Sequence, residues 1–315
     1  MTATVFIDGE AGTTGLQILE RLNRRDDLRL LRLSDAERKD AQRRAAMLNE
    51  ADLSILCLPD DAAKEAVAMV EAPGARIVDA STAHRTAPGW VYGFPEYEAA
   101  HAARIKAAKR VSNTGCYAVG FVSLVYPLVA AGLLPADFPA TVNAVSGYSG
   151  GGKSLIAAFE DPKAANATAS NYYLYALGLE HKHVEEMRVH GGLKNRPLFV
   201  PSVGRFAQGM IVAVPLQLWA LPGAPKPADL HACLAAHYAA YPEKGGRVTV
   251  ASPAETAKAK DKLDAEALSG SDGMTLHVFG NAAQGQAVLC AVLDNLGKGA
   301  AGQAVQNMEL MLGLG

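Results

Sequence analysis

Cysteine is scarce in this chain, and its scarcity excludes a disulfide-stapled fold. Four cysteines occur in 315 residues, far fewer than in small secreted domains that depend on disulfides. None of the four has metal-ligand spacing. Cys57, Cys233 and Cys290 lie in apolar or helical patterns typical of core positions. Only Cys116 follows directly on polar residues and a glycine, so by elimination it is the candidate reactive thiol.

Basic blocks, a leader and long apolar runs are missing as well. The formal net charge is −2, and no aromatic residues alternate with a cluster of Lys and Arg, which argues against a nucleic-acid partner. The first residues lack the basic start of a signal peptide. Gly120 and Pro127 interrupt the best apolar run, which is too short to span a membrane. These absences predict a cytoplasmic protein that acts on a small molecule, without membrane, nucleic acid or metal.

What is present at the start of the chain is a regular alternation of strand and helix patterns. Apolar strand patterns recur, and charged or amphipathic helical patterns separate them. The strands are predicted over 4–7, 28–33, 52–58 and 76–79, and the helices from about residue 14, over 36–49 and over 60–71. This rhythm predicts a doubly wound parallel sheet, the Rossmann architecture.

After residue 116 the pattern changes. Long apolar segments, without regular helices between the later ones, favour an α+β domain with a mixed or antiparallel sheet. These strands are predicted over 141–148, 209–219, 274–279 and 286–293. Residues 181–189 and 300–312 are predicted to be helical, and 251–273 to form a surface excursion.

A glycine-rich turn joins the first predicted strand to the first predicted helix. Gly9, Gly12 and Gly15 are spaced three residues apart, and Thr13 and Thr14 lie between the last two. Glycines let the backbone approach a pyrophosphate at a helix N-terminus. An ordinary tight turn is the alternative, but the position between strand and helix favours a dinucleotide site.

The residues after the second strand indicate which dinucleotide binds. Asp35 comes one residue later than the acid that usually holds the ribose of NAD. Ser34, Arg38 and Lys39 surround it and favour a 2′-phosphate, hence NADP. A solvated helix face is the alternative for the two cations.

Three further segments carry candidate chemistry. Cys116 stands at a loop-to-helix junction, where peptide N–H groups lower a thiol pKa and hold an anion. Ser81 and Arg85 follow the fourth strand, at the sheet edge where ligands bind; Arg85 is a candidate clamp for phosphate or carboxylate, or else a surface arginine. Ser149 and Gly150 open a glycine loop that ends in a lysine and suits an anion, with a flexible turn as the alternative.

Two histidines supply a candidate base. On a helix, His183 and Glu186 share a face, and His181 has Glu185 four residues on. A metal site is the rival interpretation, but two histidines one residue apart splay on a helix, and a third ligand is not evident. Surface histidines are the other alternative. The spacing favours His183 as the base of a thiol mechanism, without excluding His181.

Together these motifs resemble the N-acetyl-γ-glutamyl-phosphate reductase family, in its short, second type. The resemblance covers nearly the whole chain. It rests on residues 6–18, 57–63, 79–85, 92–96, 112–117, 181–183 and 294–304. The longer type usually has Asn-Pro-Gly-Cys, and Thr114 replaces that proline here, which fits the short type.

The resemblance implies the fold of glyceraldehyde-3-phosphate and aspartate-semialdehyde dehydrogenases. Residues 1–115 would be the NADP-binding Rossmann domain, on which helix 299–315 packs, and 116–298 the catalytic and dimerisation domain of a homo-oligomer. The implied reaction is reduction of N-acetyl-γ-glutamyl phosphate by NADPH in arginine biosynthesis, with release of phosphate. Cys116 would be the nucleophile, Asn295 would lie near the nicotinamide, and Asn113 would bind the substrate.

Two other classes remain open from the sequence. Aspartate-semialdehyde dehydrogenase, or a reductase of a carrier-linked aminoadipyl phosphate, would keep the thioester chemistry and change the substrate. A dinucleotide-sensing regulator would keep the fold without catalysis. The combination of Cys116 with His181 and His183 argues against such a regulator.

Overall fold

The computed structural model describes residues 2–239, 241 and 247–314, which form two compact units. Unit 1 comprises Met1–Pro95, Ala100–Gly115 and Ala300–Gly315, and unit 2 comprises Glu96–Ala99 and Cys116–Gly299. In the described part of the chain, no helix has the length and apolar character needed to cross a bilayer.

Unit 1 is built on a six-stranded sheet in which all paired strands run parallel. Its strands are β1 (Ala3–Asp8), β2 (Leu28–Leu31), β3 (Leu53–Leu56), β4 (Arg76–Asp79), β5 (Val91–Gly93) and β6 (Arg110–Asn113). Their order is β2-β1-β3-β4-β6-β5. The carboxyl ends of the strands therefore share one edge, as the predicted doubly wound sheet requires, and that prediction is confirmed.

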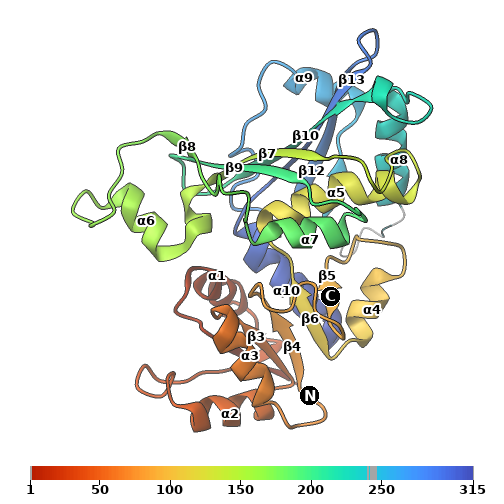
Figure 1. Ribbon diagram of the computed structural model, residues 1–315. Helices are drawn as coiled ribbons and strands as arrows, with labels where there is room; N and C mark the ends of the chain where they lie inside the picture. The colour runs from red at the N-terminus through yellow and green to blue at the C-terminus, as the bar shows by residue number, and fades with distance from the viewer. Residues whose placement is uncertain (1, 240, 242–246, 315) are drawn as a thin grey trace. The chain divides into compact units, whose positions relative to one another are not determined.

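Helices cover both faces of this sheet because the strands are apolar on both sides. Helices α1 (Thr13–Leu22), α4 (His101–Ala107) and α10 (Gly302–Leu312) pack on one face, where Val5 and Ile7 point. Helices α2 (Ala41–Glu50) and α3 (Asp60–Ala68) pack on the other face, where Phe6 points (Figure 1). Alternate residues of β1 thus serve two separate cores.

Helix α2 begins five residues later than predicted. The carboxylate of Asp40 accepts hydrogen bonds from the backbone N–H groups of Gln42 and Arg43 at 2.8 and 3.2 Å. This capping starts the helix at Ala41. Residues 35–39 form turns instead, in which the carbonyl of Ser34 accepts from two following N–H groups.

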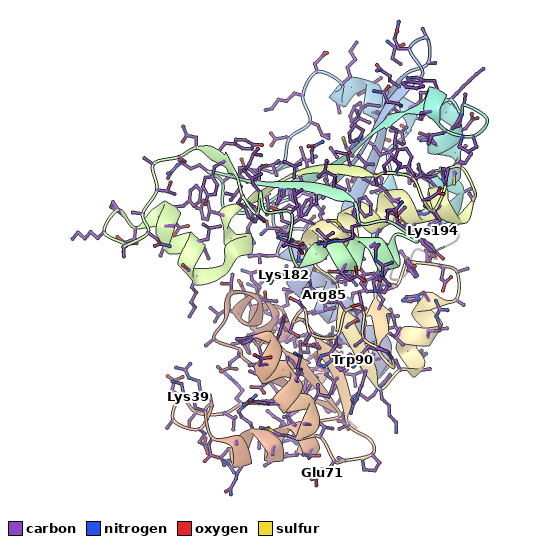
Figure 2. The ribbon with its side chains drawn as sticks, in the orientation of Figure 1. Lys39, Glu71, Arg85, Trp90, Lys182 and Lys194 are labelled. Carbon is purple, nitrogen blue, oxygen red and sulfur yellow. The ribbon has the colours of Figure 1, made fainter. Side chains whose placement is uncertain are left out.

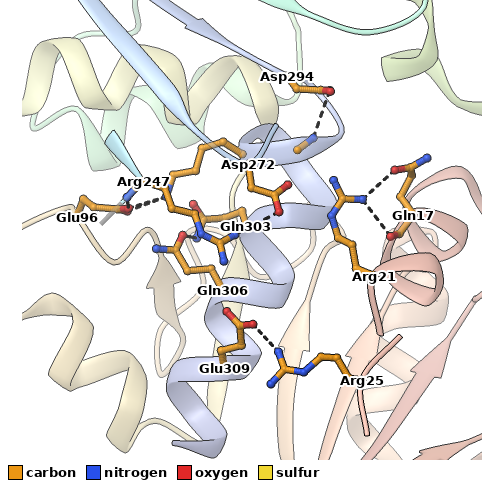
Figure 3. Close-up of polar contacts among 12 residues, drawn as sticks. Gln17, Arg21, Arg25, Glu96, Arg247, Asp272, Asp294, Gln303, Gln306 and Glu309 are labelled. Atoms are coloured by element: carbon orange, nitrogen blue, oxygen red, sulfur yellow. Dashed lines mark hydrogen bonds and ion pairs between the residues drawn. The ribbon is translucent and has the colours of Figure 1, made fainter. Parts of the chain in front are cut away.

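The C-terminal helix α10 completes the first core of unit 1. Ala304, Val305 and Met308 are buried among strand residues of that core. At the surface, Arg25 forms an ion pair with Glu309 at 2.5 Å (Figure 3). A five-residue π-helix, Gly297–Ala301, leads into α10.

Unit 2 contains a seven-stranded mixed sheet. Its strands are β7 (Thr141–Gly147), β8 (Tyr172–Leu174), β9 (Leu198–Gly204), β10 (Met210–Gln217), β11 (Val248–Val250), β12 (Met274–Asn281) and β13 (Gln286–Leu293). Their order is β11-β12-β13-β10-β7-β9-β8. The pairs β7–β9 and β11–β12 are parallel and the other pairs antiparallel, which confirms the predicted mixed sheet.

Helix α5 (Cys116–Ala130) forms the centre of unit 2. It is apolar on all sides, and it packs against β10, β13 and two other helices, α7 (His183–His190) and α8 (Pro227–Ala239). Gly120 allows close packing, because a Cβ there would lie 2.8 Å from a methyl carbon of Val212.

Helices α8 and α9 (Pro253–Ala259) correct the expectation that the later strands lack helices between them. A capping box starts α9: Ser252 accepts from the N–H of Glu255, whose side chain accepts in return from Ser252. Part of the predicted surface excursion 251–273 is therefore helical.

Candidate functional site

The glycine loop of unit 1 needs glycine at its two ends. Gly9 has φ +88°, and a Cβ there would lie 2.4 Å from the carbonyl oxygen of Cys57. A Cβ on Gly15 would lie 2.4 Å from the carbonyl oxygen of Gly9. Gly12 caps α1 without a side chain, so the first-turn N–H groups, including those of Thr13 and Thr14, meet no side-chain cap. This arrangement suits a phosphate at the helix start.

A pocket of about 260 Å³ adjoins this loop within unit 1. Its walls combine the loop backbone, apolar side chains, three cations and two carboxylates. The lining residues are Phe6, Ile7, Asp8, Gly9, Glu10, Ala11, Leu33, Arg38, Lys39, Arg44, Leu58 and Ala62. Figure 2 shows Lys39 on the loop that precedes α2.

The structure brings Arg38 to this pocket but not Ser34. The guanidinium of Arg38 lies 3.2 Å from the carboxylate of Asp35, and both side chains are exposed. The hydroxyl of Ser34 donates to Glu37 at 2.7 Å, and Ser34 is not among the lining residues. Of the two residues predicted to bind the 2′-phosphate together, Arg38 therefore lines the pocket, whereas Ser34 stabilises the turn.

Arg44 is a pocket residue that the sequence patterns missed. Its Nε and Nη2 donate to Oδ2 of Asp8 at 3.1 and 2.8 Å, and only 12% of its side chain is exposed. It stands on α2, and its partner is the last residue of β1, 36 positions earlier. Local sequence carries no signal for that pairing.

Three predicted site residues of unit 1 hold backbone at the ends of the strands. The Ser81 hydroxyl donates to the carboxylate of Asp79 at 2.7 Å and accepts from the backbone N–H of Ala83 at 3.1 Å. Arg85, labelled in Figure 2, donates from Nε to the carbonyl of Asn113 at 3.1 Å and from Nη2 to that of Ala80 at 3.3 Å. All three are buried, Asn113 to 1% exposure.

The amide of Asn113 is also committed within unit 1. Its Nδ2 donates to the carbonyl of Ala300 at 2.9 Å, and its Oδ1 accepts from Asn307 of α10 at 3.0 Å. This side chain therefore ties the end of β6 to the C-terminal helix.

In unit 2, Cys116 is the first residue of α5, as predicted. Gly299 packs closely against it: a Cβ on that glycine would lie 2.8 Å from the Cβ of Cys116. Burial raises the pKa of Cys57 and of Cys290 to about 12, and it also raises that of Cys233. These three thiols are thus poor nucleophiles at neutral pH.

Two tyrosines lie beside Cys116, and the sequence patterns missed both. Tyr175 donates to the hydroxyl of Tyr117 at 3.2 Å, and Tyr117 donates to the carbonyl of Ser202 at 3.0 Å. Burial raises the pKa of Tyr175 to about 12, and the charge of Cys116 acts in the same direction. Tyr117 is a neighbour of Cys116 in the chain, whereas Tyr175 has no local signal.

The two predicted histidines join this aromatic cluster. The ring of His181 meets those of Tyr117, Tyr175 and Phe199 at centroid distances of 5.9, 5.8 and 5.2 Å. The rings of His181 and His183 lie 4.7 Å apart. The structure therefore gathers both histidines around the residue that follows Cys116.

Helix α7 begins at His183, so His181 precedes the helix rather than lying on it as predicted. Nδ1 of His181 accepts a hydrogen bond from the backbone N–H of His183 at 3.1 Å. His183 and Glu186 are buried one turn apart on α7. Across the described residues, no group of three or more His, Cys, Asp or Glu side chains forms a candidate metal site.

Asn295 and the glycine loop after β7 meet elsewhere in unit 2. Nδ2 of Asn295 donates to the hydroxyl of Ser149 at 2.9 Å, and Oδ1 accepts from the N–H of Gly209 at 2.9 Å. A Cβ on Gly150 would lie 3.5 Å from Nδ2 of Asn295. Asn295 and the loop residues Ser149 and Gly150, predicted on two separate motifs, are thus neighbours.

Family models match both units. The model for the NAD-binding domain of semialdehyde dehydrogenase matches residues 4–105, and the model for its dimerisation domain matches 116–295. The chain belongs to the semialdehyde dehydrogenase family.

Relatives with more than 50% sequence identity carry a more specific name than the family models. A Pseudomonas putida protein named N-acetyl-gamma-glutamyl-phosphate reductase 2 is 53% identical over 312 residues, 99% of this chain and 97% of the relative. A Brucella ovis N-acetyl-gamma-glutamyl-phosphate reductase is 54% identical over 314 residues, 99% of this chain and 100% of the relative. The resemblance found from the motifs is confirmed.

Solved structures show the same fold at low identity. Aspartate semialdehyde dehydrogenase II from Vibrio cholerae aligns with a TM-score of 0.70 at 17% identity, covering 99% of each chain. The Francisella tularensis aspartate semialdehyde dehydrogenase aligns with a TM-score of 0.71 at 12% identity, covering 98% of this chain and 100% of the other. The predicted fold class is confirmed.

Proposed function

We propose that the chain catalyses the NADPH-dependent reduction of N-acetyl-γ-glutamyl phosphate to N-acetylglutamate semialdehyde and phosphate, a step of arginine biosynthesis. The observation that carries this proposal is the thiol of Cys116 at the start of α5, beside an aromatic and histidine cluster. The names of relatives at 53–54% identity support the substrate.

Cys116 is the proposed nucleophile. Its thiolate attacks the acyl carbon, the carbon–oxygen bond to phosphate breaks, and phosphate leaves with the bonding electrons. The product is a thioester on Sγ. N–H groups at the start of α5 stabilise the negative charge that develops on the acyl oxygen. NADPH supplies the hydride that reduces this thioester.

The two histidines take different parts in the second half of the reaction. Because Nδ1 of His181 accepts from a backbone N–H, its neutral ring carries the proton on Nε2 and donates a hydrogen bond to the substrate oxygen. His183, one turn from the carboxylate of Glu186, is the proposed acid that protonates the thiohemiacetal oxygen. The thiohemiacetal then releases the aldehyde and restores the thiol.

Unit 1 is the proposed NADP-binding domain, and unit 2 the catalytic and dimerisation domain. The glycine loop and the N-terminus of α1 fit a pyrophosphate. Arg38 and Lys39 bring to the adjoining pocket the cations that a 2′-phosphate requires, whereas Arg44 is paired with Asp8. Asn295, held by Ser149, is proposed to face the nicotinamide. A Candida albicans aspartate semialdehyde dehydrogenase of the same fold was solved with NADP.

Ser81, Arg85 and Asn113 are proposed to act by holding backbone at the ends of β4 and β6, because their polar groups bond to neighbouring atoms of unit 1. Contact of Arg85 and Asn113 with the substrate stays a prediction. Gly150 is proposed to give the substrate or the cofactor ring close access to the backbone.

The chain is further proposed to form a homo-oligomer, a dimer or tetramer, through unit 2. The family model that matches 116–295 describes a dimerisation domain, which supports assembly through this unit. Sedimentation velocity tests this assembly. A cytoplasmic location is proposed because none of the four cysteines, all of which the structure describes, forms a disulfide.

One assay tests the reaction in its reverse direction. The purified chain should reduce NADP with N-acetylglutamate semialdehyde only when inorganic phosphate is present. Aspartate semialdehyde and the aminoadipate analogue, offered at equal concentration, should react much more slowly. Faster turnover of aspartate semialdehyde would replace the proposed substrate, and no turnover of any aldehyde would favour the non-catalytic regulator.

A further inference from the structure

We propose that the buried ion pair between Glu96 and Lys298 positions the thiol of Cys116, acting through the backbone of Gly299. Neither charged side chain takes part in the chemistry described above. The inference rests on the proposed role of Cys116 as nucleophile, and all four residues belong to unit 2.

The pair is almost completely withdrawn from solvent. Nζ of Lys298 donates to both carboxylate oxygens of Glu96, each at 2.8 Å. The side chains are 0% and 1% exposed. Burial lowers the pKa of Lys298 to about 8, even though the charge of Glu96 acts to raise it. A buried pair contributes little net stability compared with packed apolar groups, so its presence calls for another role.

Glu96 is itself fixed in place from several sides. Its carboxylate also accepts a hydrogen bond from the backbone N–H of Arg247 at 2.7 Å, drawn in Figure 3. Its carbonyl lies 3.2 Å from Nε2 of His237 on α8. The guanidinium of Arg247 lies 3.5 Å from Asp272. Lys298 therefore reaches a carboxylate whose position other parts of unit 2 determine.

Hydrogen bonds also fix the backbone of the segment that carries Lys298, from Asp294 to Gly299. The carboxylate of Asp294, 0% exposed, accepts from the N–H groups of Leu296 and Gly270 at 2.8 and 2.5 Å (Figure 3). The N–H of Gly299 donates to the carbonyl of Asp294 at 3.0 Å. The residues around Lys298 thus form a tight turn that opens the π-helix Gly297–Ala301.

Gly299 carries this constraint to Cys116. A Cβ on Gly299 would lie 2.8 Å from the Cβ of Cys116 and 3.3 Å from its Cα. The backbone of Gly299 therefore packs directly against Cys116, the first residue of α5. If the ion pair is lost, the turn relaxes, and the backbone of Gly299 and the thiol of Cys116 move together. A displacement of about 1 Å at a reacting atom can cost roughly 10²-fold in rate.

The test uses Lys298→Met, Glu96→Gln and the double variant, in the full chain. The double variant removes the pair without leaving one buried charge alone. We expect all three to slow the phosphate burst by about 10²-fold, with NADPH affinity unchanged. The pH profile of iodoacetamide alkylation of Cys116 should also shift, since the thiol moves relative to the N–H groups at the start of α5.

Two controls separate positioning from general instability. Leu234→Ala removes a fully buried side chain of α8 in the same unit, and at a matched fall in Tm it should leave the burst and the alkylation profile unchanged. Arg25→Met breaks an ion pair that lies within unit 1 and should also leave both unchanged. Wild-type burst rates in the ion-pair variants, or equal losses in Leu234→Ala, would overturn the inference.

Gly299→Ala tests the same contact between Gly299 and Cys116 if the ion-pair variants do not fold. It keeps both charges and adds one methyl group toward Cys116, so it should slow the burst at least as much as Lys298→Met. A burst at the wild-type rate would overturn the proposed route through Gly299. Cys116→Ser distinguishes the two proposals: if that variant turns over normally, the nucleophile assignment itself fails.

Discussion

Units 1 and 2 offer a ligand different kinds of groups. The pocket of unit 1 presents backbone of the glycine loop and charged side chains, among which Arg44 is paired with Asp8. The region around Cys116 in unit 2 presents side chains that carry or accept protons: a thiol, two phenols and two imidazoles. Backbone and fixed charge suit an invariant pyrophosphate and phosphate, whereas titratable side chains suit a substrate that changes during the reaction.

Both units also contain polar residues that support the site without belonging to it. In unit 1, Ser81, Arg85 and Asn113 bond to backbone or side chains of the fold. In unit 2, the comparable constraint comes from Asp294, Glu96 and Lys298, which lie outside the cluster of reactive groups. Each site is therefore supported by a second set of polar residues, and four predictions test this division.

The largest effect is expected for the nucleophile of unit 2. Cys116→Ser should lower turnover to below about 10⁻³ of wild type, because a hydroxyl at this position has no accessible anion. NADPH affinity, measured by fluorescence titration, should stay nearly unchanged, since the proposed cofactor site lies in unit 1. Cys233→Ser is the matched control and should keep full activity. Turnover within a few-fold of wild type for Cys116→Ser would end the assignment.

Replacing the acid of unit 2 should have the next largest effect. His183→Asn should lower steady-state turnover by about 10²–10⁴-fold and still release one equivalent of phosphate in a burst, because thioester formation needs only the thiolate. His181→Asn keeps an N–H donor and should lose less than His181→Ala. If both Asn variants turn over normally between pH 6 and 9, neither histidine is the acid.

The cations of unit 1 should affect cofactor choice and leave the chemistry intact. Arg38→Glu should weaken NADPH by about 10–100-fold, since a charge-assisted contact is lost and repulsion is added. NADH should be much less affected, and kcat at saturating NADPH should be retained. Arg24→Glu, at an exposed position in the turn after α1, is the control. Equal losses for both cofactors would instead indicate damage to unit 1.

The residues of both units show which features of the structure could be predicted from the sequence and which could not. The parallel sheet, the glycine loop and Cys116 were predictable because their signals are local: alternation of patterns, glycine spacing and a loop-to-helix junction. Arg44 with Asp8, and Lys298 with Glu96, were not, because their partners lie 36 and 202 positions away. Arg85 was predicted from its place after the fourth strand and Asn113 from the family resemblance, but whether such polar groups face a ligand or the fold depends on tertiary packing.

The smallest effect concerns the stability of unit 1 alone. The N–H and then the hydroxyl of Thr4 lower the pKa of Asp52. The stabilisation is therefore complete above the carboxyl pKa of the unfolded chain, about 3.9, and is lost as pH falls through the lower pKa of the folded state. Asp52→Asn should cost at most about 1 kcal/mol at pH 7 because the site is exposed.

Urea unfolding of wild type and Asp52→Asn at pH 7 and pH 3 measures this difference. The two proteins should differ less at the lower pH. A gap that stays constant or widens with acid would show that Asp52 acts other than through its charge.

The placement of α10 has a consequence for the order in which the molecule is made. Ala301, Ala304, Val305, Met308 and Met311 fill the core that β1, α1 and α4 leave open in unit 1. A ribosome adds these residues after all of unit 2. While unit 2 is still being translated, the part of unit 1 that is already made therefore exposes an apolar face that α10 will later bury. Chaperone engagement during synthesis should concentrate on that face, and it should end when the last helix docks.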